Sequence, residues 1–322
     1  MKKYFITGCS GFVGTFLIDL INKKNDDGAV LGVDTSTLRI DPKWNSICVD
    51  FKNIDLNQIE DIKNTLSEFK PDFIIHLASM SSVKFSWENP ILSFENNTRI
   101  FLNILETVRN LQIHPRILSV GSSEEYGQVD PEAVPLNENS PLNPISPYAV
   151  ARVAQGLFSK LYANSYNLDI VITRSFNHIG PGQSDEFAIS SFAKQIAEIN
   201  SDNKIEQKLH VGDISVVRDY LDVRDVVKAY LMLLESGEKG EVYNICKGEG
   251  HSIRDMIDML MQIANKKIPI IHDSSRNRPA DNPIIIGSNA KIKEKLGWEP
   301  RYSLKSSLMD VYKYWQDRIR KL

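Results

Sequence analysis

The run Gly8-Cys9-Ser10-Gly11-Phe12-Val13-Gly14 follows a predicted strand, Tyr4–Thr7, and leads at once into a predicted helix, Phe12–Lys23. Each glycine has a mechanical reason: the first permits a tight turn, the second lets a pyrophosphate approach the backbone, and the third lets the helix pack closely on the strand. The free N–H groups of the helix N-terminus then face the anion. The stretch predicts a dinucleotide-binding turn.

Two acidic residues lie where the next strands are predicted to end. Asp34 ends the predicted strand Val30–Asp34, and its carboxylate is placed to accept hydrogen bonds from the adenosine ribose and to repel a 2′-phosphate. The expected cofactor is therefore NAD rather than NADP. Asp50, at the end of the predicted strand Ser46–Asp50, is a further candidate contact for the adenine amino group, although a plain strand-end cap fits it nearly as well.

Short apolar runs alternate with longer amphipathic stretches as far as about residue 175. The further predicted strands are Phe73–His76, Ile117–Val120 and Ile170–Thr173, and the further helices are Leu56–Phe69, Pro90–Asn110 and Pro147–Tyr166. This alternation predicts an α/β fold, a Rossmann-type doubly wound parallel sheet. We expect residues 1–174 with 219–245 to form the dinucleotide-binding domain, and residues 175–218 with 246–322 to form a smaller α/β substrate domain.

The pattern after residue 175 is looser, with glycine, proline and asparagine between the elements. The predicted helices there are Phe187–Ile199, Val223–Glu235, Ile253–Ala264 and Leu304–Arg318, and the predicted strands are Leu209–Val211 and Val242–Ile245.

The composition of the 322 residues excludes several classes of protein. Thirty-eight basic against 41 acidic residues give a net charge of −3, which offers no electrostatic footprint for nucleic acid. Cys9, Cys48 and Cys246 are scattered and odd in number, so neither a disulfide scaffold nor a CxxC metal site is expected, and no metal is predicted. There is no run of 18 apolar residues, and the N-terminus is typical of a strand rather than a signal peptide. These features predict a cytoplasmic enzyme without a membrane partner.

A second group of polar residues is expected at the same edge of the sheet. Ser122, Ser123 and Glu124 directly follow a predicted buried strand, and Tyr148 and Arg152 lie one helical turn apart on one face. A fixed cation stabilises a phenolate, and such a tyrosine exchanges a proton with a carbonyl or alcohol oxygen that a serine hydroxyl holds. Taken alone, the helix is better explained as an amphipathic helix with a buried tyrosine and a surface arginine. Together with the glycine turn it predicts a catalytic site.

These motifs resemble the extended short-chain dehydrogenase/reductase family of nucleotide-sugar enzymes over essentially the whole chain. The matching elements are the glycine turn, Asp34, His76-Leu77-Ala78, Ser122 before Tyr126-Gly127, and the helix of Tyr148. Within the family the chain is most similar to the GDP-4-keto-6-deoxy-D-mannose reductases, and GDP-mannose 4,6-dehydratases are more distant. The stretches that carry this similarity are Ser122–Gly127, Phe176–Ser184, Phe192–Ile196, Val217–Asp219, Asp222–Asp225 and Arg278-Pro279.

The resemblance implies a role for each matching residue. Ser122 would bind the sugar C4 oxygen and Tyr148 would be the acid/base, while Arg152 stands where the family has a lysine. The implied cofactor contacts are Gly8, Gly11, Phe12, Val13, Gly14, Asp34, Asp50, Phe51, Leu77, Ala78, Tyr148 and Arg152. The implied substrate contacts are Ser122, Ser123, Asn177, Lys194, Arg218 and Arg278. For Arg218 the alternative is an ion pair with Asp219 or Asp222, and for Arg278 an ion pair with Asp281.

The implied reaction is NAD-dependent hydride transfer at C4 of a GDP-linked manno-type sugar, as 4-keto reduction or C4 oxidation. Two alternatives stay open: a GDP-sugar 4,6-dehydratase with Glu124 as base, and a catalytically weak member that binds cofactor and sugar. The family also implies a homodimer through a four-helix interface. The helices Pro90–Asn110 and Pro147–Tyr166 carry apolar residues on more than one face: Ile100, Phe101, Ile104, Leu105, Val153, Leu157, Phe158 and Leu161. One face must cover the sheet, and the other is free to pair with its twin in a second subunit.

Overall fold

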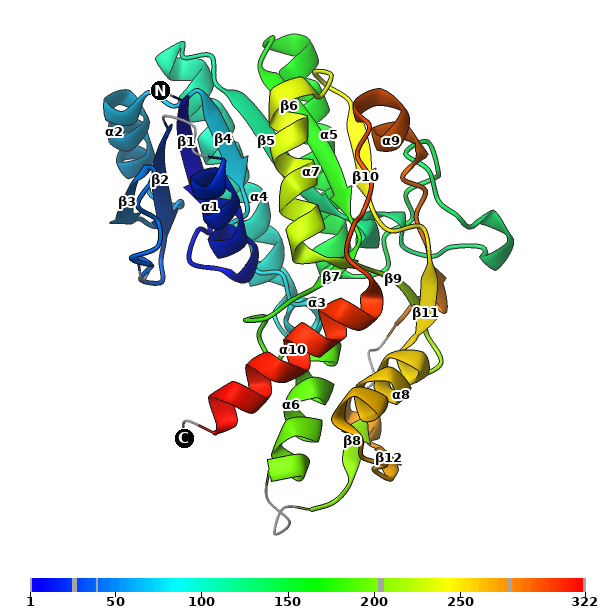
Figure 1. The fold of residues 1–322 in the computed structure, drawn as a ribbon. Coiled ribbons are helices and arrows are strands. Elements are labelled where there is room, and N and C mark those ends of the chain that lie inside the picture. Colours follow the sequence, from blue (N-terminus) through cyan, green and yellow to red (C-terminus); the bar gives the residue numbers. More distant parts are fainter. Residues whose placement is uncertain (1, 25–27, 39, 202–205, 277–279, 321–322) are drawn as a thin grey trace.

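The computed structural model describes residues 2–24, 28–38, 40–201, 206–276 and 280–320. A seven-stranded parallel sheet with the order β10-β6-β5-β4-β1-β2-β3 dominates it (Figure 1). The strand order reverses between β1 and β4, and in open α/β sheets ligands bind at the carboxyl ends of the strands beside such a reversal. The strands are β1 (Lys2–Thr7), β2 (Gly28–Asp34), β3 (Cys48–Asn53), β4 (Phe73–His76), β5 (Arg116–Ser122), β6 (Asp169–Ser175) and β10 (Val242–Ile245).

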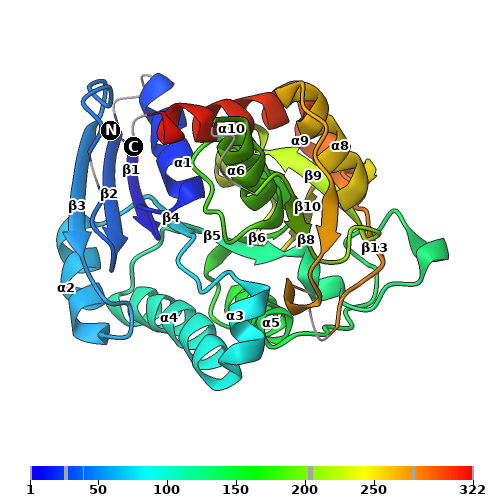
Figure 2. The ribbon, with the colours of Figure 1, turned by 90° about the horizontal axis from the view of Figure 1, so that it is seen from below.

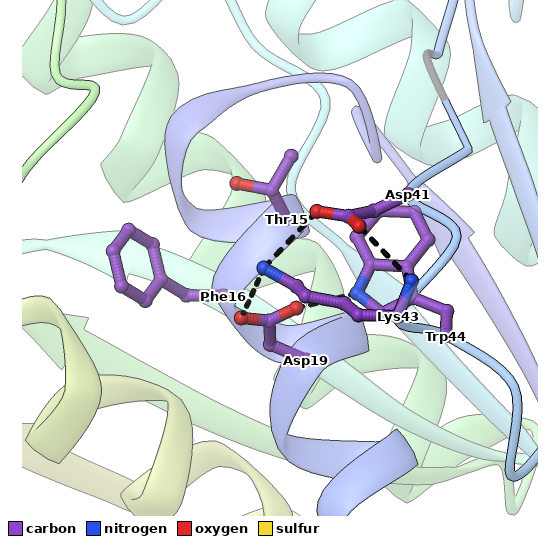
Figure 3. A pocket seen from close by; sticks show the side chains of 6 residues that line it. All are labelled: Thr15, Phe16, Asp19, Asp41, Lys43 and Trp44. Carbon is purple, nitrogen blue, oxygen red and sulfur yellow. Dashed lines mark hydrogen bonds and ion pairs between the residues drawn. The ribbon is translucent and has the colours of Figure 1, made fainter.

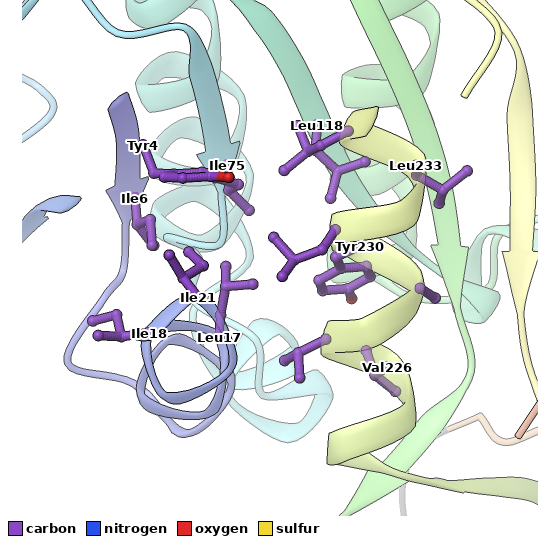
Figure 4. Close-up of a cluster of buried hydrophobic side chains, with 14 of the residues drawn as sticks. Tyr4, Ile6, Leu17, Ile18, Ile21, Ile75, Leu118, Val226, Tyr230 and Leu233 are labelled. Atoms are coloured by element: carbon purple, nitrogen blue, oxygen red, sulfur yellow. The ribbon is translucent and has the colours of Figure 1, made fainter. Parts of the chain in front are cut away.

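Helices cover both faces of this sheet, as predicted for a doubly wound fold. On one face α1 (Phe12–Lys23) and α7 (Val223–Ser236) pack side by side through Leu17, Val226 and Tyr230 (Figure 4). The opposite face carries α2 (Ile59–Phe69), α4 (Pro90–Leu111) and α5 (Pro147–Ser165), with α3 (Val83–Glu88) beside them (Figure 2). The expected Rossmann-type architecture is confirmed.

The second part of the chain lies beyond the carboxyl edge of the sheet (Figure 1). A small sheet has the order β11-β9-β13, with β7 also paired to β9, and a two-stranded sheet joins β12 to β8. Its strands are β7 (Asn177–Ile179), β8 (Leu209–Val211), β9 (Val217–Asp222), β11 (Gly250–Ser252), β12 (Ile270–His272) and β13 (Ile284–Ile285). Its helices are α6 (Ala188–Ser201), α8 (Ile253–Ala264) and α10 (Leu304–Ile319), which share one apolar core.

The structure corrects some boundaries that the pattern suggested. β3 continues to Asn53 because it pairs with β2 as far as the partners Asp34 and Asn53. Asp50 therefore lies inside β3, exposed, and not at the end of the strand. β9 lies wholly in the second sheet, so the expected domain boundary at residue 219 crosses a strand. The division into domains stays a prediction.

Short elements escaped the sequence pattern because they span too few residues to show a period. They are α3, α9 (Ala290–Leu296), the strands β7, β11, β12 and β13, and the 3₁₀ turns η1 (Ser123–Tyr126), η2 (Pro131–Ala133) and η3 (Ser274–Arg276). The six-residue strand β9 was also not predicted. Across the described ranges, no helix combines the length and apolarity needed to cross a bilayer.

Candidate active site

The glycine turn has the geometry that a pyrophosphate needs. Gly8 has a φ of +67°, and a Cβ there would lie 2.7 Å from the backbone N of Ala78. A Cβ on Gly14 would lie 2.4 Å from the carbonyl oxygen of Cys9, so α1 packs too closely on the turn that follows β1 for a side chain. At Gly11 a Cβ would meet only the Gly8 oxygen, at 3.2 Å. Gly11 is also the N-cap of α1, and no side chain of the described residues caps that helix.

The residues predicted to surround this turn lie at the same sheet edge. The Asp34 carboxylate accepts hydrogen bonds from the backbone N of Ser10 at 3.1 Å and from the Ser10 hydroxyl, so the end of β2 is tied to the glycine turn. The backbone N of Leu77 donates to the Thr7 carbonyl at 3.2 Å. The other predicted cofactor contacts on this edge, Phe12, Val13, Phe51 and Ala78, are half-buried. The residues present therefore fit a dinucleotide.

Ser122 is the last residue of β5 and the N-cap of η1. Its Oγ accepts a hydrogen bond from the backbone N of Glu124 at 3.2 Å, which leaves the hydroxyl proton available for donation to a ligand. Its own backbone N donates to Oε1 of Glu125 at 2.9 Å. Glu124 is half-buried, whereas Ser123 has only 2% of its surface exposed and is set back in η1.

Tyr148 and Arg152 lie in the first two turns of α5, which packs against both β5 and η1. Ser146 caps this helix, because its Oγ accepts from the backbone N of Ala149 at 3.1 Å. The guanidinium carbon of Arg152 lies 5.1 Å from the ring centroid of Tyr148. Arg152 is 5% exposed, so the alternative of a surface arginine is wrong. A buried cation therefore lies over the face of the Tyr148 ring.

Sequence reasoning missed the residues that hold this arginine. Nη1 donates to Oε1 of Gln155 at 2.5 Å and to the Val120 carbonyl at 3.2 Å, and Nη2 donates to the Ser79 hydroxyl. The spacing from 152 to 155 on a helix was a signal that could have found Gln155, but Ser79 comes from the loop after β4.

Burial and then the charge of Arg152 lower the pKa of His76 to about 3, so its imidazole is neutral.

Glu125 and Arg174 form a buried ion pair directly behind Ser122. Nε of Arg174 donates to Oε2 of Glu125 at 3.1 Å, and the two residues are 5% and 2% exposed, respectively. Burial raises the pKa of Glu125, while Arg174 and the backbone N of Ser122 oppose that rise. No motif pointed to this pair, because β6 and η1 are far apart along the chain.

The candidate substrate contacts of the second part are more dispersed. Asn177 begins β7 and is half-buried. Arg218 is 4% exposed; Nη1 donates to the Asn282 carbonyl at 2.7 Å, and Nη2 pairs with Asp281. The ion-pair alternative for Arg218 thus involves Asp281, whereas Asp219 and Asp222 were the predicted partners. Lys194, on α6, forms an ion pair with Asp185, and its Nζ lies 2.7 Å from Oδ2 of that residue. Arg278 lies outside the described residues.

Asp219 has a structural task in the second part. Its carboxylate accepts from the backbone N atoms of Lys247 at 2.9 Å, Gly248 at 2.8 Å and Gly287 at 3.3 Å. It joins β9 to the loops before β11 and after β13. Burial raises its pKa to about 6 in spite of these three donors.

A separate hollow of about 190 Å³ lies on the outer side of α1 (Figure 3). Its walls include Thr15, Phe16 and Trp44. Nζ of Lys43 lies 3.1 Å from carboxylate oxygens of both Asp19 and Asp41 in it. None of the predicted site residues lines this hollow.

Comparisons with known proteins identify the family. A family model described as GDP-mannose 4,6 dehydratase matches residues 5–311. The chain is 34% identical to the GDP-6-deoxy-D-mannose reductase of Pseudomonas aeruginosa over 319 residues, which cover 99% of each protein. It is 27% identical to GDP-mannose 4,6 dehydratase 1 of Arabidopsis thaliana, with 93% of this chain and 86% of that protein covered.

Solved structures show the same fold over almost the whole chain. The structure of RMD from Pseudomonas aeruginosa complexed with NADPH has a TM-score of 0.87 at 33% identity and covers 99% of this chain and 100% of that one. The UDP-glucose 4-epimerase of Thermus thermophilus in complex with NAD has a TM-score of 0.84 at 28% identity, with 98% and 99% covered. The resemblance drawn from the motifs is confirmed: the chain belongs to the GDP-mannose 4,6-dehydratase family of the extended short-chain dehydrogenases/reductases.

Proposed function

We propose that the protein is a nucleotide-sugar oxidoreductase that transfers hydride at C4 of a GDP-linked manno-type sugar. The observation that carries the proposal is the arrangement of Ser122, Tyr148 and Arg152 at the sheet edge next to the glycine turn. The 34% identity to a GDP-6-deoxy-D-mannose reductase supports a GDP-linked substrate and favours the direction of 4-keto reduction.

The chain's own residues manage the oxygen and its proton. The Oγ of Ser122 already accepts a hydrogen bond from the backbone N of Glu124. Its hydroxyl donates a hydrogen bond to the C4 oxygen and so orients that oxygen. Tyr148 gives its phenolic proton to that oxygen in reduction and takes the proton back in oxidation, and Arg152 stabilises the phenolate that results. Nicotinamide, when bound, supplies or accepts the hydride.

Conversion of a GDP-4-keto-6-deoxy sugar tests the reaction. The purified protein is expected to consume reduced cofactor in proportion to the 4-keto sugar supplied, and to yield the C4 alcohol by mass spectrometry. Ser122→Ala serves as the matched variant, because it removes the donor while Tyr148 stays; its kcat should fall by about 10²-fold or more. Failure of the wild-type protein to turn over any 4-keto GDP sugar would refute the proposal.

The proposed cofactor is NAD(H), and Asp34 is the reason. Its carboxylate, fixed by Ser10, disfavours a 2′-phosphate by charge repulsion. A similar structure holds NADPH, so a kinetic comparison of NADH with NADPH tests this assignment directly. The expected kcat/KM is higher with NADH than with NADPH, and Asp34→Asn should narrow that difference by about tenfold, since it removes the negative charge and keeps the size. A wild-type preference for NADPH contradicts this assignment.

A second candidate is a 4,6-dehydratase with Glu124 as the base, and the family model's description favours it. Glu124 is half-buried two residues after Ser122, at the same strand end. Incubation with GDP-mannose and NAD⁺ separates the two: a dehydratase loses water from the sugar without net consumption of cofactor. If the protein is a dehydratase, Glu124→Gln should abolish the loss of water. If it is a reductase, Glu124→Gln should still oxidise the reduced cofactor with the 4-keto sugar.

The diphosphate of the substrate is proposed to contact Asn177, Arg218 and Arg278, with Lys194 as a weaker candidate. Ser123, next to Ser122, is proposed as a further contact for the substrate. A guanidinium matches two phosphate oxygens at once, which a lysine cannot do. Arg218→Lys should therefore raise KM for the GDP sugar by about tenfold and change kcat less. Equal KM values for the two proteins would exclude Arg218 as a contact.

We also propose that two copies of the chain associate through α4 and α5. Ile100, Phe101, Ile104 and Leu105 are buried within the subunit and belong to the face of α4 that covers the sheet. Other apolar side chains of these helices are exposed: Ile91 (73%), Leu92 (50%), Phe94 (40%), Val150 (43%), Leu157 (61%) and Leu161 (50%). Leu157→Glu should give a monomer in analytical ultracentrifugation, while Met309→Glu on α10, where Met309 is 49% exposed, should not.

A further inference from the structure

Arg152 is a buried cation held by neutral oxygen atoms. Its Nη atoms donate to the Gln155 amide oxygen, the Val120 carbonyl and the Ser79 hydroxyl. Within the described residues no carboxylate forms an ion pair with it, and its Nε is buried without a hydrogen-bond partner. Buried charges are normally paired with an opposite charge, so this arrangement needs a reason.

The Gln155 side chain is itself fixed in one orientation. Its Nε2 donates to Ser119 Oγ at 3.0 Å and to the Val120 carbonyl at 3.1 Å, so both donor sites of the amide are directed at β5. Only the amide oxygen remains for Arg152. Gln155 is 1% exposed and Ser119 is fully buried, and Ser159 Oγ lies 2.9 Å from Ser119 Oγ. The glutamine is therefore a rigid, neutral acceptor.

The titratable groups that surround Arg152 do not cancel its charge. On β4, His76 is neutral because burial and the nearby cation lower its pKa. On α7, Tyr230 keeps its proton because burial raises its pKa. In η1, Glu125 acts on Arg152 only through space and is bonded to Arg174 at 3.1 Å. Tyr148, 5.1 Å away, is the remaining group whose anion the guanidinium can stabilise.

We propose that Gln155 is a positioning residue that holds the Arg152 guanidinium beside Tyr148 while leaving its positive charge intact. The inference rests on the proposed function, in which Tyr148 exchanges the proton. A glutamate at this position would bind the guanidinium equally well but would neutralise it. An apolar residue would leave the charge intact but release the guanidinium from its place. Charge and position can thus be separated by two substitutions.

Gln155→Glu and Gln155→Met make that separation. Tyr148 ionisation is followed by tyrosinate absorbance, as the difference between each protein and its own Tyr148→Phe form, which needs neither cofactor nor substrate. Gln155→Glu should move the ionisation midpoint of Tyr148 to higher pH by about one unit or more, because the carboxylate cancels the cation. The pH profile of kcat/KM for the 4-keto GDP sugar should move in the same direction.

Gln155→Met keeps the charge but releases the guanidinium from its place beside Tyr148, so the midpoint should rise less than in Gln155→Glu, while kcat falls about tenfold and KM changes less than about threefold. Ser159→Ala is the matched control, because it removes a hydroxyl from the same buried cluster without touching the guanidinium; its midpoint should equal that of the wild type. An unmoved midpoint in Gln155→Glu overturns the proposal, as does an equal shift in Ser159→Ala. An inactive wild type would refute the proposed function alone, since the absorbance titration still tests the role of Gln155.

Discussion

Replacing Glu125 by leucine should lower the free energy of unfolding by about 3 kcal/mol. The substitution leaves the Arg174 guanidinium buried without its countercharge, and the backbone N of Ser122 loses its acceptor at 2.9 Å. Breaking one partner of a buried pair costs about 3–5 kcal/mol. The lower end applies here, because Arg174 keeps Tyr126 Oη at 3.2 Å and the Glu138 carbonyl at 3.0 Å. A cavity of about 40 Å³ beside the pair also admits a water molecule.

Denaturant unfolding, with midpoint and slope compared between variants, measures this loss. Glu125→Gln should be destabilised less, because its amide oxygen still accepts from the Ser122 backbone N. The double variant Glu125→Leu with Arg174→Met should recover a large part of the stability, since it removes both charges together. The reasoning is refuted if Glu125→Leu unfolds within about 1 kcal/mol of the wild type, or if the double variant is less stable than the single one.

Three further changes test other parts of the molecule. Tyr148→Phe keeps the ring but removes the hydroxyl, so kcat should fall about 10²–10⁴-fold while dinucleotide affinity, measured by calorimetry, stays within about threefold; a parallel loss of affinity would speak against an acid/base role. Gly14→Ala places a Cβ 2.4 Å from the Cys9 carbonyl oxygen and should destabilise the protein by about 1–3 kcal/mol in thermal unfolding, which an unchanged melting temperature would contradict. Burial raises the pKa of Asp219 from 3.8 to about 6, so the native state binds this proton more tightly than the unfolded state. The contribution of Asp219 to the free energy of unfolding should therefore be fully present below pH 3.8 and be lost, by about 3 kcal/mol, as the pH rises through about 6. Asp219→Asn should flatten this dependence of the unfolding free energy on pH. An equal slope in both proteins contradicts the assignment.

The local parts of the fold could be predicted closely from the sequence. Helix Phe12–Lys23 and strands Phe73–His76 and Val242–Ile245 have the predicted limits, and the glycine turn has the expected steric demands. Each of these depends on residues that are adjacent along the chain or on a repeated apolar period. Ser122 and Tyr148 could be named as candidates for the same reason, since their motifs lie within one strand end or one helical turn.

The order of residues along the chain does not indicate which residues that are distant in sequence come into contact. The pairing of Arg218 with Asp281 joins residues far apart in sequence, and so does that of Arg174 with Glu125. The place of Asp50 inside β3 follows from the register with β2, a contact between strands. The sequence by itself determined that a tyrosine and an arginine share one helical face and that a glycine turn joins the first strand to the first helix. Only the tertiary structure decided that the arginine is buried and held by Ser79 and Gln155, because burial and hydrogen-bond partners depend on how separate elements pack.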